Sequence, residues 1–321
     1  MKRNNIVILS AGRRVELVKA FQHAANELNL DTLVIGADMC PELSSACYVA
    51  DESVAVPRVS SEHYVASLLK LCQEKGVGLV VPTIDTELKI LSEVREAFLE
   101  IGTHIIISDP ELIASCRDKR LTGEFFETLG ITYPTVYSRE NVPVPSFCKP
   151  YDGSCSKGAV AIYKKTDLTD DLLNDDKNMF MELVPKSYCE VTVDGYYTND
   201  GLLKCLVPRE RLEVRGGEVS KGKTIKSHLY DYLIERLSHI KGARGCITFQ
   251  VFYNKQTSDI KGLEINPRFG GGFPLTNAVR GEYPKWLMQE YLLDKEITFF
   301  DDWDVGAIML RYDAMVITHE N

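Results

Sequence analysis

The first 110 residues alternate between strand and helix patterns, and this alternation constrains the possible fold more than any other feature of the sequence. Short apolar runs that are typical of buried strands occur at residues 6–9, 33–36, 79–82 and 105–107. Amphipathic helical patterns lie between them, at residues 15–28, 64–72 and 88–99. Because repeated strand–helix–strand units form a parallel sheet covered by helices, the sequence predicts an α/β domain over residues 1–110.

The pattern changes after residue 132. A helix predicted over residues 119–129 ends at Gly130, a natural helix stop. From residue 132 to 265 the chain consists mostly of short strand patterns, and helices are expected near 227–240 and 284–292. The strand patterns lie at residues 135–137, 147–149, 159–163, 179–184, 189–193, 247–253 and 260–265. This second part predicts an α+β region with antiparallel strands.

The composition indicates a soluble globular protein, with 45% hydrophobic and 26% charged residues in a chain of 321. This length exceeds what one core usually supports, so two or three subdomains are expected. The formal net charge of -9 argues against nucleic acid or an anionic membrane as the main partner. No signal peptide or membrane-spanning run is apparent, and nine cysteines without a C-x-x-C pair favour reduced thiols in a cytoplasmic protein.

A loop of small residues follows Lys149, which ends one of the strand patterns. The loop over residues 150–158 contains Gly153, Ser154, Ser156, Lys157 and Gly158. Glycine and serine let backbone N–H groups approach and bind phosphate oxygens, and Lys149 adds a positive charge. The order is not that of a Walker A loop. A hairpin turn with a surface lysine explains this segment equally well when it is considered alone.

Polar side chains at the end of a later strand suit a metal ion. Strand alternation places Glu264 and Asn266 on one face, and Gln250 on the preceding strand offers a third oxygen. Magnesium binds such oxygens and takes its other ligands from phosphate and water. Arg268 follows, and its planar guanidinium suits a phosphate or carboxylate. The alternative is a polar pair on an edge strand, followed by a flexible turn at Gly270–Gly272.

Three further segments allow both a functional and a structural interpretation. The apolar run at 179–184 contains Glu182, with Glu190 eight residues later, and alone it is more typical of a core strand with a surface acid. Arg209, Arg211, Glu213 and Arg215 share one face of a strand, which could bind an anion or simply face solvent. Residues 85–87 lie at the carboxyl end of a parallel strand, the edge of the sheet where ligands bind. Asp85, Thr86 and Glu87 also make a good helix start, and this capping role is favoured over ligand binding.

In this order, the motifs resemble those of the ATP-grasp superfamily, most closely the ATP-binding halves of carbamoyl-phosphate synthase large chains and free-standing carboxylate–amine ligases. The resemblance covers essentially the whole chain. It implies a Rossmann-like pre-ATP-grasp domain at residues 1–110 and a two-lobed ATP-grasp domain at 111–321. The second domain would comprise a lid subdomain at about 132–182 and a catalytic lobe at about 183–321.

The resemblance also assigns roles to individual residues. Lys119 and Lys149 look like the two lysines that bind ATP, and Gly153, Ser154, Ser156, Lys157 and Gly158 look like the glycine-rich lid loop. Glu182, Leu183 and Val184 look like the hinge that meets adenine, and Glu190 looks like the acid that holds the ribose. Gln250, Glu264 and Asn266 look like the metal ligands, and Arg268 like the arginine on the transferring phosphate. Two positions depart from the pattern, Cys155 in the lid loop and Lys186 after the hinge.

The implied activity is ligation driven by ATP. Mg²⁺ or Mn²⁺ with ATP would phosphorylate a carboxylate, with Arg209 and Arg211 as further catalytic candidates, and an amine or another nucleophile would capture the acyl phosphate. The partners expected are small-molecule carboxylates and amines, and the oligomeric state is open, although dimers are the commonest assembly. One alternative is a carbamoyl-phosphate-synthase-like subunit or a non-catalytic ATP-binding partner. A dinucleotide-dependent oxidoreductase is disfavoured because residues 10–14 lack G-x-G-x-x-G.

Overall fold

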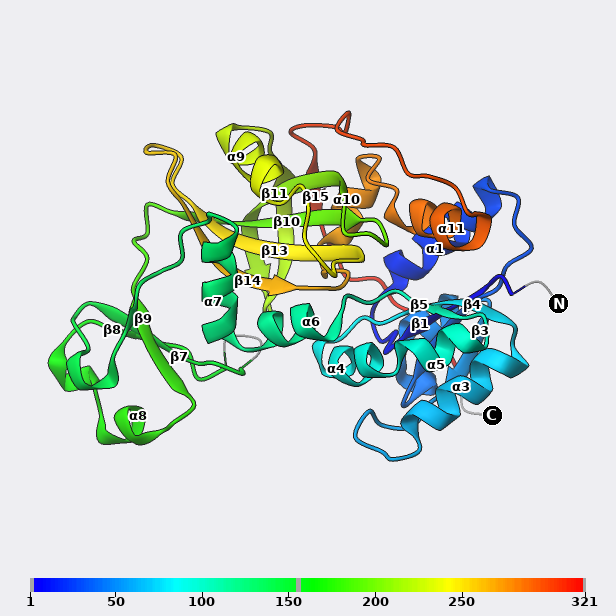
Figure 1. Cartoon of the computed structure of the whole chain (residues 1–321), viewed down its shortest axis with the longest axis horizontal. Coiled ribbons are helices and arrows are strands. Elements are labelled where there is room, and N and C mark those ends of the chain that lie inside the picture. Colours follow the sequence, from blue (N-terminus) through cyan, green and yellow to red (C-terminus); the bar gives the residue numbers. More distant parts are fainter. Residues whose placement is uncertain (1–2, 154–156, 320–321) are drawn as a thin grey trace.

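The computed structural model describes residues 3–153 and 157–319, and this part of the chain contains three β-sheets (Figure 1). A five-stranded sheet belongs to the N-terminal region, a four-stranded sheet projects to one side, and a six-stranded sheet lies between and above them. The chain is therefore mixed α/β and α+β, as predicted from the sequence. The division into residues 1–110, a lid at about 132–182 and a catalytic lobe at about 183–321 stays a prediction.

The N-terminal sheet is entirely parallel, with strand order β3-β2-β1-β4-β5. Its strands in chain order are β1 (Asn5–Leu9), β2 (Val34–Asp38), β3 (Glu52–Ala55), β4 (Val77–Val81) and β5 (His104–Ile105). Strand alternation sends Val7 and Leu9 to one face and Ile6 and Ile8 to the other, and all four are fully buried. The apolar run of β1 thus supplies both faces of a sheet that is covered on each side.

The six-stranded sheet is antiparallel and has the order β14-β13-β10-β11-β12-β15. Its strands are β10 (Cys189–Tyr197), β11 (Leu203–Arg215), β12 (Glu218–Thr224), β13 (Gly245–Tyr253), β14 (Ile260–Asn266) and β15 (Ile308–Leu310). The smaller sheet, with order β6-β9-β7-β8, is also antiparallel. It comprises β6 (Val136–Tyr137), β7 (Ser146–Pro150), β8 (Val160–Ile162) and β9 (Asn178–Glu182). The predicted antiparallel character of this half is confirmed.

The helices connect and cover these sheets. The helices of the N-terminal region and its junction are α1 (Val15–Glu27), α2 (Ser45–Val49), α3 (Tyr64–Glu74), α4 (Asp85–Glu93), α5 (Arg95–Glu100), α6 (Pro110–Arg117) and α7 (Lys119–Thr128). Those that follow are α8 (Asp170–Asn174), α9 (His228–Arg236), α10 (Phe273–Ala278) and α11 (Tyr283–Leu293), and short 3-10 turns lie at Pro41–Leu43, Arg139–Asn141 and Lys165–Asp167. The single helix predicted over 88–99 is wrong in one respect, because Val94 leaves helical geometry (φ -109°, ψ 8°) and separates α4 from α5.

Two hydrophobic cores flank the parallel sheet. Val7 and Leu9 pack with α3, α4 and α5, whereas Ile6 and Ile8 belong to a larger core that includes α1, α11 and the six-stranded sheet. The N-terminal region is therefore packed against the large sheet through shared apolar contacts. The four-stranded sheet has a small core of its own, formed by Val142, Cys148, Ile162 and Phe180.

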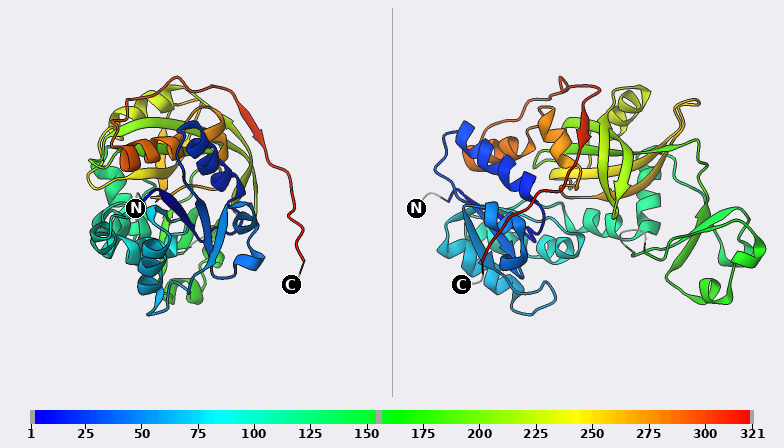
Figure 2. Two further views of the ribbon diagram at one scale, coloured as in Figure 1. Left: turned by 90° about the vertical axis from the view of Figure 1, so that its right-hand side faces the viewer. Right: turned by 180° about the vertical axis from the view of Figure 1, so that it is seen from behind.

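The chain after β15 is extended and crosses toward the N-terminal sheet (Figure 2). There, Thr318 donates a hydrogen bond to the Tyr48 hydroxyl at 3.2 Å. Every helix within residues 3–153 and 157–319 is too short or too polar to cross a bilayer.

Candidate functional site

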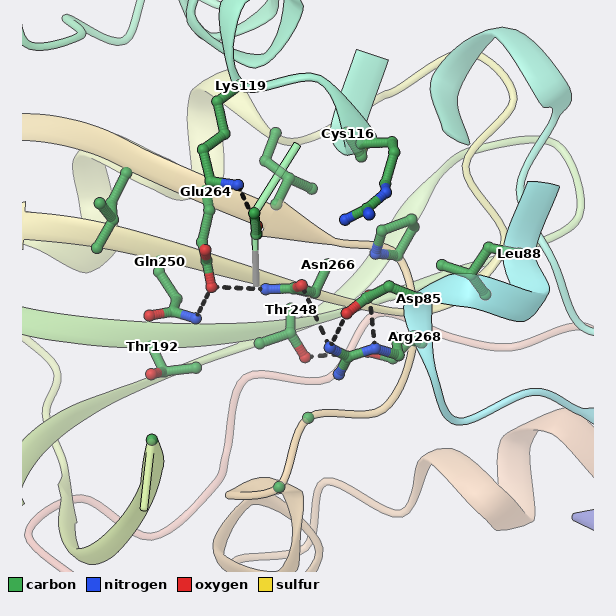
Figure 3. Close-up of a pocket in the computed structure, with 18 of the residues that line it drawn as sticks. Asp85, Leu88, Cys116, Lys119, Thr192, Thr248, Gln250, Glu264, Asn266 and Arg268 are labelled. Carbon is green, nitrogen blue, oxygen red and sulfur yellow. Dashed lines mark hydrogen bonds and ion pairs between the residues drawn. The ribbon is translucent and has the colours of Figure 1, made fainter. Parts of the chain in front are cut away.

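A cavity of about 1410 Å³ lies where the three sheets approach one another. Its wall combines the start of α4, helices α6 and α7, strand β7 and one face of the six-stranded sheet (Figure 3). Almost every segment that carried a motif in the sequence contributes to this wall. The fold therefore brings together segments that are separated by more than 150 residues along the chain, such as Asp85 and Arg268.

The floor of the cavity is one face of the six-stranded sheet. Thr192 on β10 stands opposite Arg209 on β11 and Gln250 on β13, and Gln250 in turn stands opposite Glu264 on β14. Since opposite residues in antiparallel strands point to the same face, register alone aligns these side chains. The residues referred to below as the cavity floor are Glu190, Thr192, Arg209, Arg211, Gln250, Glu264, Asn266 and Arg268, all of which line the cavity.

The three predicted metal ligands lie together on this floor (Figure 3). Glu264 Oε1 accepts hydrogen bonds from the amides of Gln250 and, at 3.0 Å, Asn266. Gln250 Oε1 accepts a hydrogen bond from Arg211 at 2.7 Å. The set offers one carboxylate and two amide oxygens. In the free protein both amide oxygens accept from arginines, Gln250 from Arg211 and Asn266 from Arg268 at 3.3 Å, so metal binding would replace these bonds.

This ligand set fits a magnesium ion that a nucleotide also coordinates. Magnesium prefers oxygen ligands and commonly binds through one or two carboxylates together with phosphate oxygens and water. No group of three or more His, Cys, Asp or Glu side chains that could hold a metal occurs in the described ranges. With one carboxylate and two amide oxygens from the protein, the ion would take its other ligands from phosphate oxygens and water.

Two lysines, buried Lys149 and half-buried Lys119, face Glu264 from the opposite wall. Lys149 on β7 is only 7% exposed, and burial, followed by repulsion from Lys119, lowers its pKa to about 8. Burial also lowers the pKa of Lys119, the first residue of α7, although Glu264 opposes both shifts. The Lys119 amine donates a hydrogen bond to the carbonyl of Gly153. Two desolvated like charges at one wall favour an anionic ligand between them.

The lid loop is described only in part. Gly153 and Lys157 line the cavity, whereas Ser154 and Ser156, together with Cys155, lie outside the described residues. Gly158 has φ +74°, and a Cβ there would stand 3.1 Å from Pro150, so glycine suits this position both sterically and conformationally. The role predicted for this loop in phosphate binding stays a prediction.

Arg268 forms a bidentate ion pair with Asp85. Its Nε and Nη2 atoms each donate to an Asp85 oxygen at 2.8 Å, which connects the floor to the start of α4. The prediction that a helix starts at residues 85–87 is right. The interpretation of Asp85 as a cap is wrong, because Ile84 is the N-cap residue and no side chain caps it. Glu87, which is buried, accepts hydrogen bonds from the hydroxyls of Ser10 and Tyr64.

The arginine strand differs from the predicted arrangement of four charges on one face. Arg209 is 2% exposed and pairs with buried Asp194 at 2.6 Å, and Arg211 pairs with Glu190 at 3.1 Å. The register between β11 and β12 shifts twice beyond Arg211. Arg215 consequently points to solvent, where it pairs with Asp313. Only Arg209 and Arg211 of the four line the cavity within the part of the chain that the structure describes.

The residues predicted to form the hinge do not lie in the wall of the cavity. Glu182, at the end of β9, binds Lys261 through both carboxylate oxygens at 2.8 Å. Among the described residues, neither Glu182 nor Leu183 nor Val184 belongs to the cavity lining. Their contact with adenine stays a prediction. Glu190 lines the cavity, but its partner is Arg211, and its contact with the ribose likewise stays a prediction.

Sequence reasoning did not select several residues that line the cavity. These are Arg13, Arg14, Thr192, Glu218 and Thr248. Arg13 and Arg14 follow the first strand, and their position at the carboxyl end of a parallel strand was the available signal. The glycines at 270–272 lie against neighbouring side chains, which leaves little room for a Cβ. A Cβ on Gly272 would stand 2.1 Å from Arg209 Nη1, and one on Gly271 would meet the Glu218 carboxylate at 3.0 Å.

Two family models match separate parts of the chain. Residues 6–106 match a model described as PylC-like, N-terminal domain, and residues 174–308 match one described as ATP-grasp in the biosynthetic pathway with Ter operon. The chain is an ATP-grasp protein. The predicted superfamily is thereby confirmed. No curated protein matches the chain significantly.

Solved ATP-grasp structures share the fold at low sequence identity. The biotin carboxylase domain of Hydrogenobacter thermophilus 2-oxoglutarate carboxylase has a TM-score of 0.72 at 13% identity, over 96% of this chain and 74% of that one. The N5-carboxyaminoimidazole synthetase of Staphylococcus aureus gives 0.67 at 16%, over 97% and 81%. An L-amino acid ligase of Bacillus licheniformis gives 0.65 at 11%, over 91% and 75%. This ATP-grasp chain spans 30% of a similar Rhizobium etli pyruvate carboxylase.

Proposed function

We propose that this ATP-grasp protein is a carboxylate–amine ligase that binds Mg-ATP in the cavity and transfers the γ-phosphate to a substrate carboxylate. The observation that carries the proposal is the pair of desolvated lysines, Lys119 and Lys149, opposite the oxygen-rich set around Glu264. A triphosphate supplies the negative charge that the lysines need. It also supplies the phosphate oxygens that complete a magnesium site.

Similar proteins support this choice of ligands. The S. aureus synthetase was solved with ADP, and the H. thermophilus domain with MgADP and bicarbonate. By analogy, Gln250, Glu264 and Asn266 would hold Mg²⁺ or Mn²⁺, and the metal would offset the charge of the phosphates. Small-molecule carboxylates and amines are the proposed substrates. The H. thermophilus domain was solved as a dimer, and a cytoplasmic homodimer is the proposed state of this chain.

The residues of the cavity would act mainly by positioning and electrostatics. The substrate carboxylate attacks the γ-phosphorus, ADP leaves, and the amine then displaces phosphate from the acyl phosphate. Lys149 and Lys119 hold the phosphates, while Arg268 is oriented by Asp85 to stabilise charge on the transferring group. Arg211 is held between Glu190 and Gln250 at the same wall. Closure of the lid that carries residues 152–158 would exclude water, which would otherwise hydrolyse the acyl phosphate.

An assay of ADP release tests the proposal. The full chain is incubated with ATP and Mg²⁺ and a panel of carboxylic acids, each combined with amino acids or ammonia. ADP release that requires both an acid and an amine, with an amide product by mass spectrometry, is the expected result. Glu264→Ala should abolish turnover while the protein stays folded, and Arg280→Gln, at an exposed ion pair with Asp302, is the matched control.

The opposite outcome has a defined meaning. ATP binding without ADP release for any acid would favour the alternative, a carbamoyl-phosphate-synthase-like subunit or a non-catalytic ATP-binding partner. Near-normal turnover by folded Glu264→Ala protein would refute the metal assignment.

A further inference from the structure

A second group of cations lies at the end of the cavity formed by the N-terminal sheet. Arg14 precedes α1, at the carboxyl end of β1, and lines the cavity beside Arg13. The reacting phosphate has its own binding groups in Lys119, Lys149 and Arg268. Arg13 and Arg14 have no part in the mechanism described above, and their charge therefore needs a separate explanation.

The segment that carries Arg14 is held rigidly. The N–H of Gly12 donates to an Asp38 carboxylate oxygen at 2.9 Å, and the Gly12 carbonyl accepts from Ser44 Oγ at 3.0 Å. The N–H of Arg14 itself donates to the carbonyl of Ala11 at 2.7 Å. The position of Arg14 is thus set by backbone contacts before any ligand binds, which is the condition for precise recognition.

The charges around Arg14 do not balance. Arg268 is paired with Asp85, and Arg311 with Glu218 at 3.0 Å. Burial raises the pKa of Glu218, but the hydrogen bond from Arg311 and the positive charges of Arg14 and Arg13 lower it by more. The pKa of Glu218 therefore lies below its usual range. Four arginines therefore face two carboxylates, an excess of two positive charges.

Few groups of the protein offset the positive charge of Arg14. Within the described ranges its guanidinium donates one hydrogen bond, from Nη2 to the carbonyl of Thr83 at 3.3 Å, and forms no ion pair. Burial and then repulsion from Arg268 lower its pKa. A desolvated guanidinium without a counter-ion is costly, and an anion at the cavity side would remove that cost.

The backbone next to Arg14 favours the same kind of ligand. Helix α1 is 13 residues long, and no described side chain caps its N-terminus. The partial positive charge of a helix N-terminus adds to that of the guanidinium. The charge of Arg14, its burial and the helix dipole thus all favour an anionic ligand.

We propose that the carboxylate substrate carries a second anionic group, a carboxylate or a phosphate, which Arg14 binds with help from Arg13 at the N-terminus of α1. The inference rests on the proposed function, since it concerns the substrate of the same cavity. It narrows the substrate class to acids with two negative groups. One group would be phosphorylated, and the other would anchor the molecule.

Matched pairs of acids test this inference. Succinate is compared with butyrate, and 3-phosphoglycerate with glycerate, in the ADP-release assay with ammonia and mixed amino acids. The wild-type protein should show a lower KM for at least one acid with two anionic groups than for its partner with one. Which pair responds identifies the anchoring group as a carboxylate or a phosphate.

Substitution of Arg14 then separates anchoring from a general effect. Arg14→Gln should raise the KM for the preferred acid about 10- to 100-fold, the range expected for loss of a charge-assisted hydrogen bond, with little change in kcat. Arg14→Lys should recover part of that loss, and Arg280→Gln should behave as wild type. Equal use of both members of each pair, or equal loss for both in Arg14→Gln, would overturn the inference and leave the proposed function intact.

Binding measurements cover the case in which no acid is turned over. That result would count against the proposed function, but calorimetry of the wild-type chain with a non-hydrolysable ATP analogue and each acid still decides the inference. Binding of succinate or 3-phosphoglycerate that Arg14→Gln abolishes would support it. Absence of binding by both acids would overturn it.

Discussion

The cations on the floor of the cavity differ from those on its rim in whether they form ion pairs with the protein. On the floor, Arg209, Arg211 and Arg268 each pair with a carboxylate of the protein, namely Asp194, Glu190 and Asp85. On the rim, defined as Lys119, Lys149 and Arg14, no cation forms an ion pair with a residue that the structure describes. Burial nevertheless lowers the pKa of all three rim groups.

This difference distinguishes charges that hold the fold from charges that await a ligand. A paired buried arginine is stable in the free protein, and losing its partner is destabilising. An unpaired buried cation weakens the free protein and is stabilised when an anion binds. Substitutions that break the arginine ion pairs of the floor should therefore reduce stability, whereas substitutions on the rim should reduce ligand binding and turnover.

The largest effect on the floor is expected from Asp194→Ala. Asp194 is fully buried, and it accepts hydrogen bonds from Arg209, Thr248 and Thr276. Its removal leaves the Arg209 guanidinium buried without a counter-ion, which should lower the free energy of unfolding by about 3–5 kcal/mol. Urea denaturation measures this loss. A double variant, Asp194→Leu with Arg209→Met, should recover most of it, and a loss below about 1 kcal/mol in the single variant would contradict the comparison.

On the rim, Lys149→Met should lower ATP turnover by about 100- to 1000-fold, the size typical for removal of one electrostatic catalytic contact. Its stability should rise, because the protonated amine is disfavoured at its buried site in the free protein. ADP release and urea denaturation of one preparation measure both quantities. A variant that loses stability as Asp194→Ala does would abolish the distinction between floor and rim.

A smaller effect is expected at the connection between the floor and α4. Asp85→Asn leaves Arg268 with the Asn266 oxygen at 3.3 Å and its own neighbouring carbonyl. The free energy of unfolding should fall by about 1–3 kcal/mol, as for loss of a hydrogen-bonded charge. Asp302→Asn, at an exposed pair with Arg280, is the control and should change stability by less than about 0.5 kcal/mol. Equal effects in both variants would refute the role of Asp85.

The smallest effect is a pH dependence of ATP affinity. The pKa of Lys149 is lowered from 10.5 to about 8 in the free protein, so the amine loses its charge as pH rises through about 8. Bound phosphate would restore the proton, and affinity should fall by up to about tenfold per pH unit above that value. Calorimetry between pH 7 and 9.5 tests this. Lys149→Arg keeps its charge throughout and should bind ATP with little pH dependence over the same range.

The same lysine pKa predicts how stability changes with pH. Because the folded pKa lies below the unfolded value, the unfolded chain binds more protons between pH 8 and 10.5. The contribution of Lys149 to stability therefore becomes more favourable as pH rises through this window. A bound nucleotide should reduce the effect.

Much of the fold follows from local patterns in the sequence. Alternation placed Glu264 and Asn266 on one face, and the apolar runs marked β1, β2 and β4 to within a few residues. Strand β12 was missed because the segment Glu218–Thr224 contains only one aliphatic residue, Val219, among glycine, lysine and other polar residues. Its pairing with β11, rather than its composition, makes it a strand.

The ion-pair partners of charged residues could be predicted less well from the sequence. Asp85 and Arg268 are 183 residues apart, and no local pattern connects them. Arg215 was expected on the same face as Arg209, but after two shifts in register Arg215 points to solvent and Val214 lines the cavity instead. Such contacts depend on how sheets are assembled, and a single sequence carries no direct signal for them.

The small core of the four-stranded sheet also bears on how the molecule loses its structure. Among the described residues, its own core holds four buried side chains, Val142, Cys148, Ile162 and Phe180, whereas Met179 and Met181 of β9 join the main core, which extends from β1 to α11. The four-stranded sheet should therefore unfold locally at a lower free energy than the rest, and its amide protons should exchange with solvent first. Denaturation of this chain should then not be a single cooperative event, and a probe located in this sheet should report an earlier midpoint than one in β10 or β13.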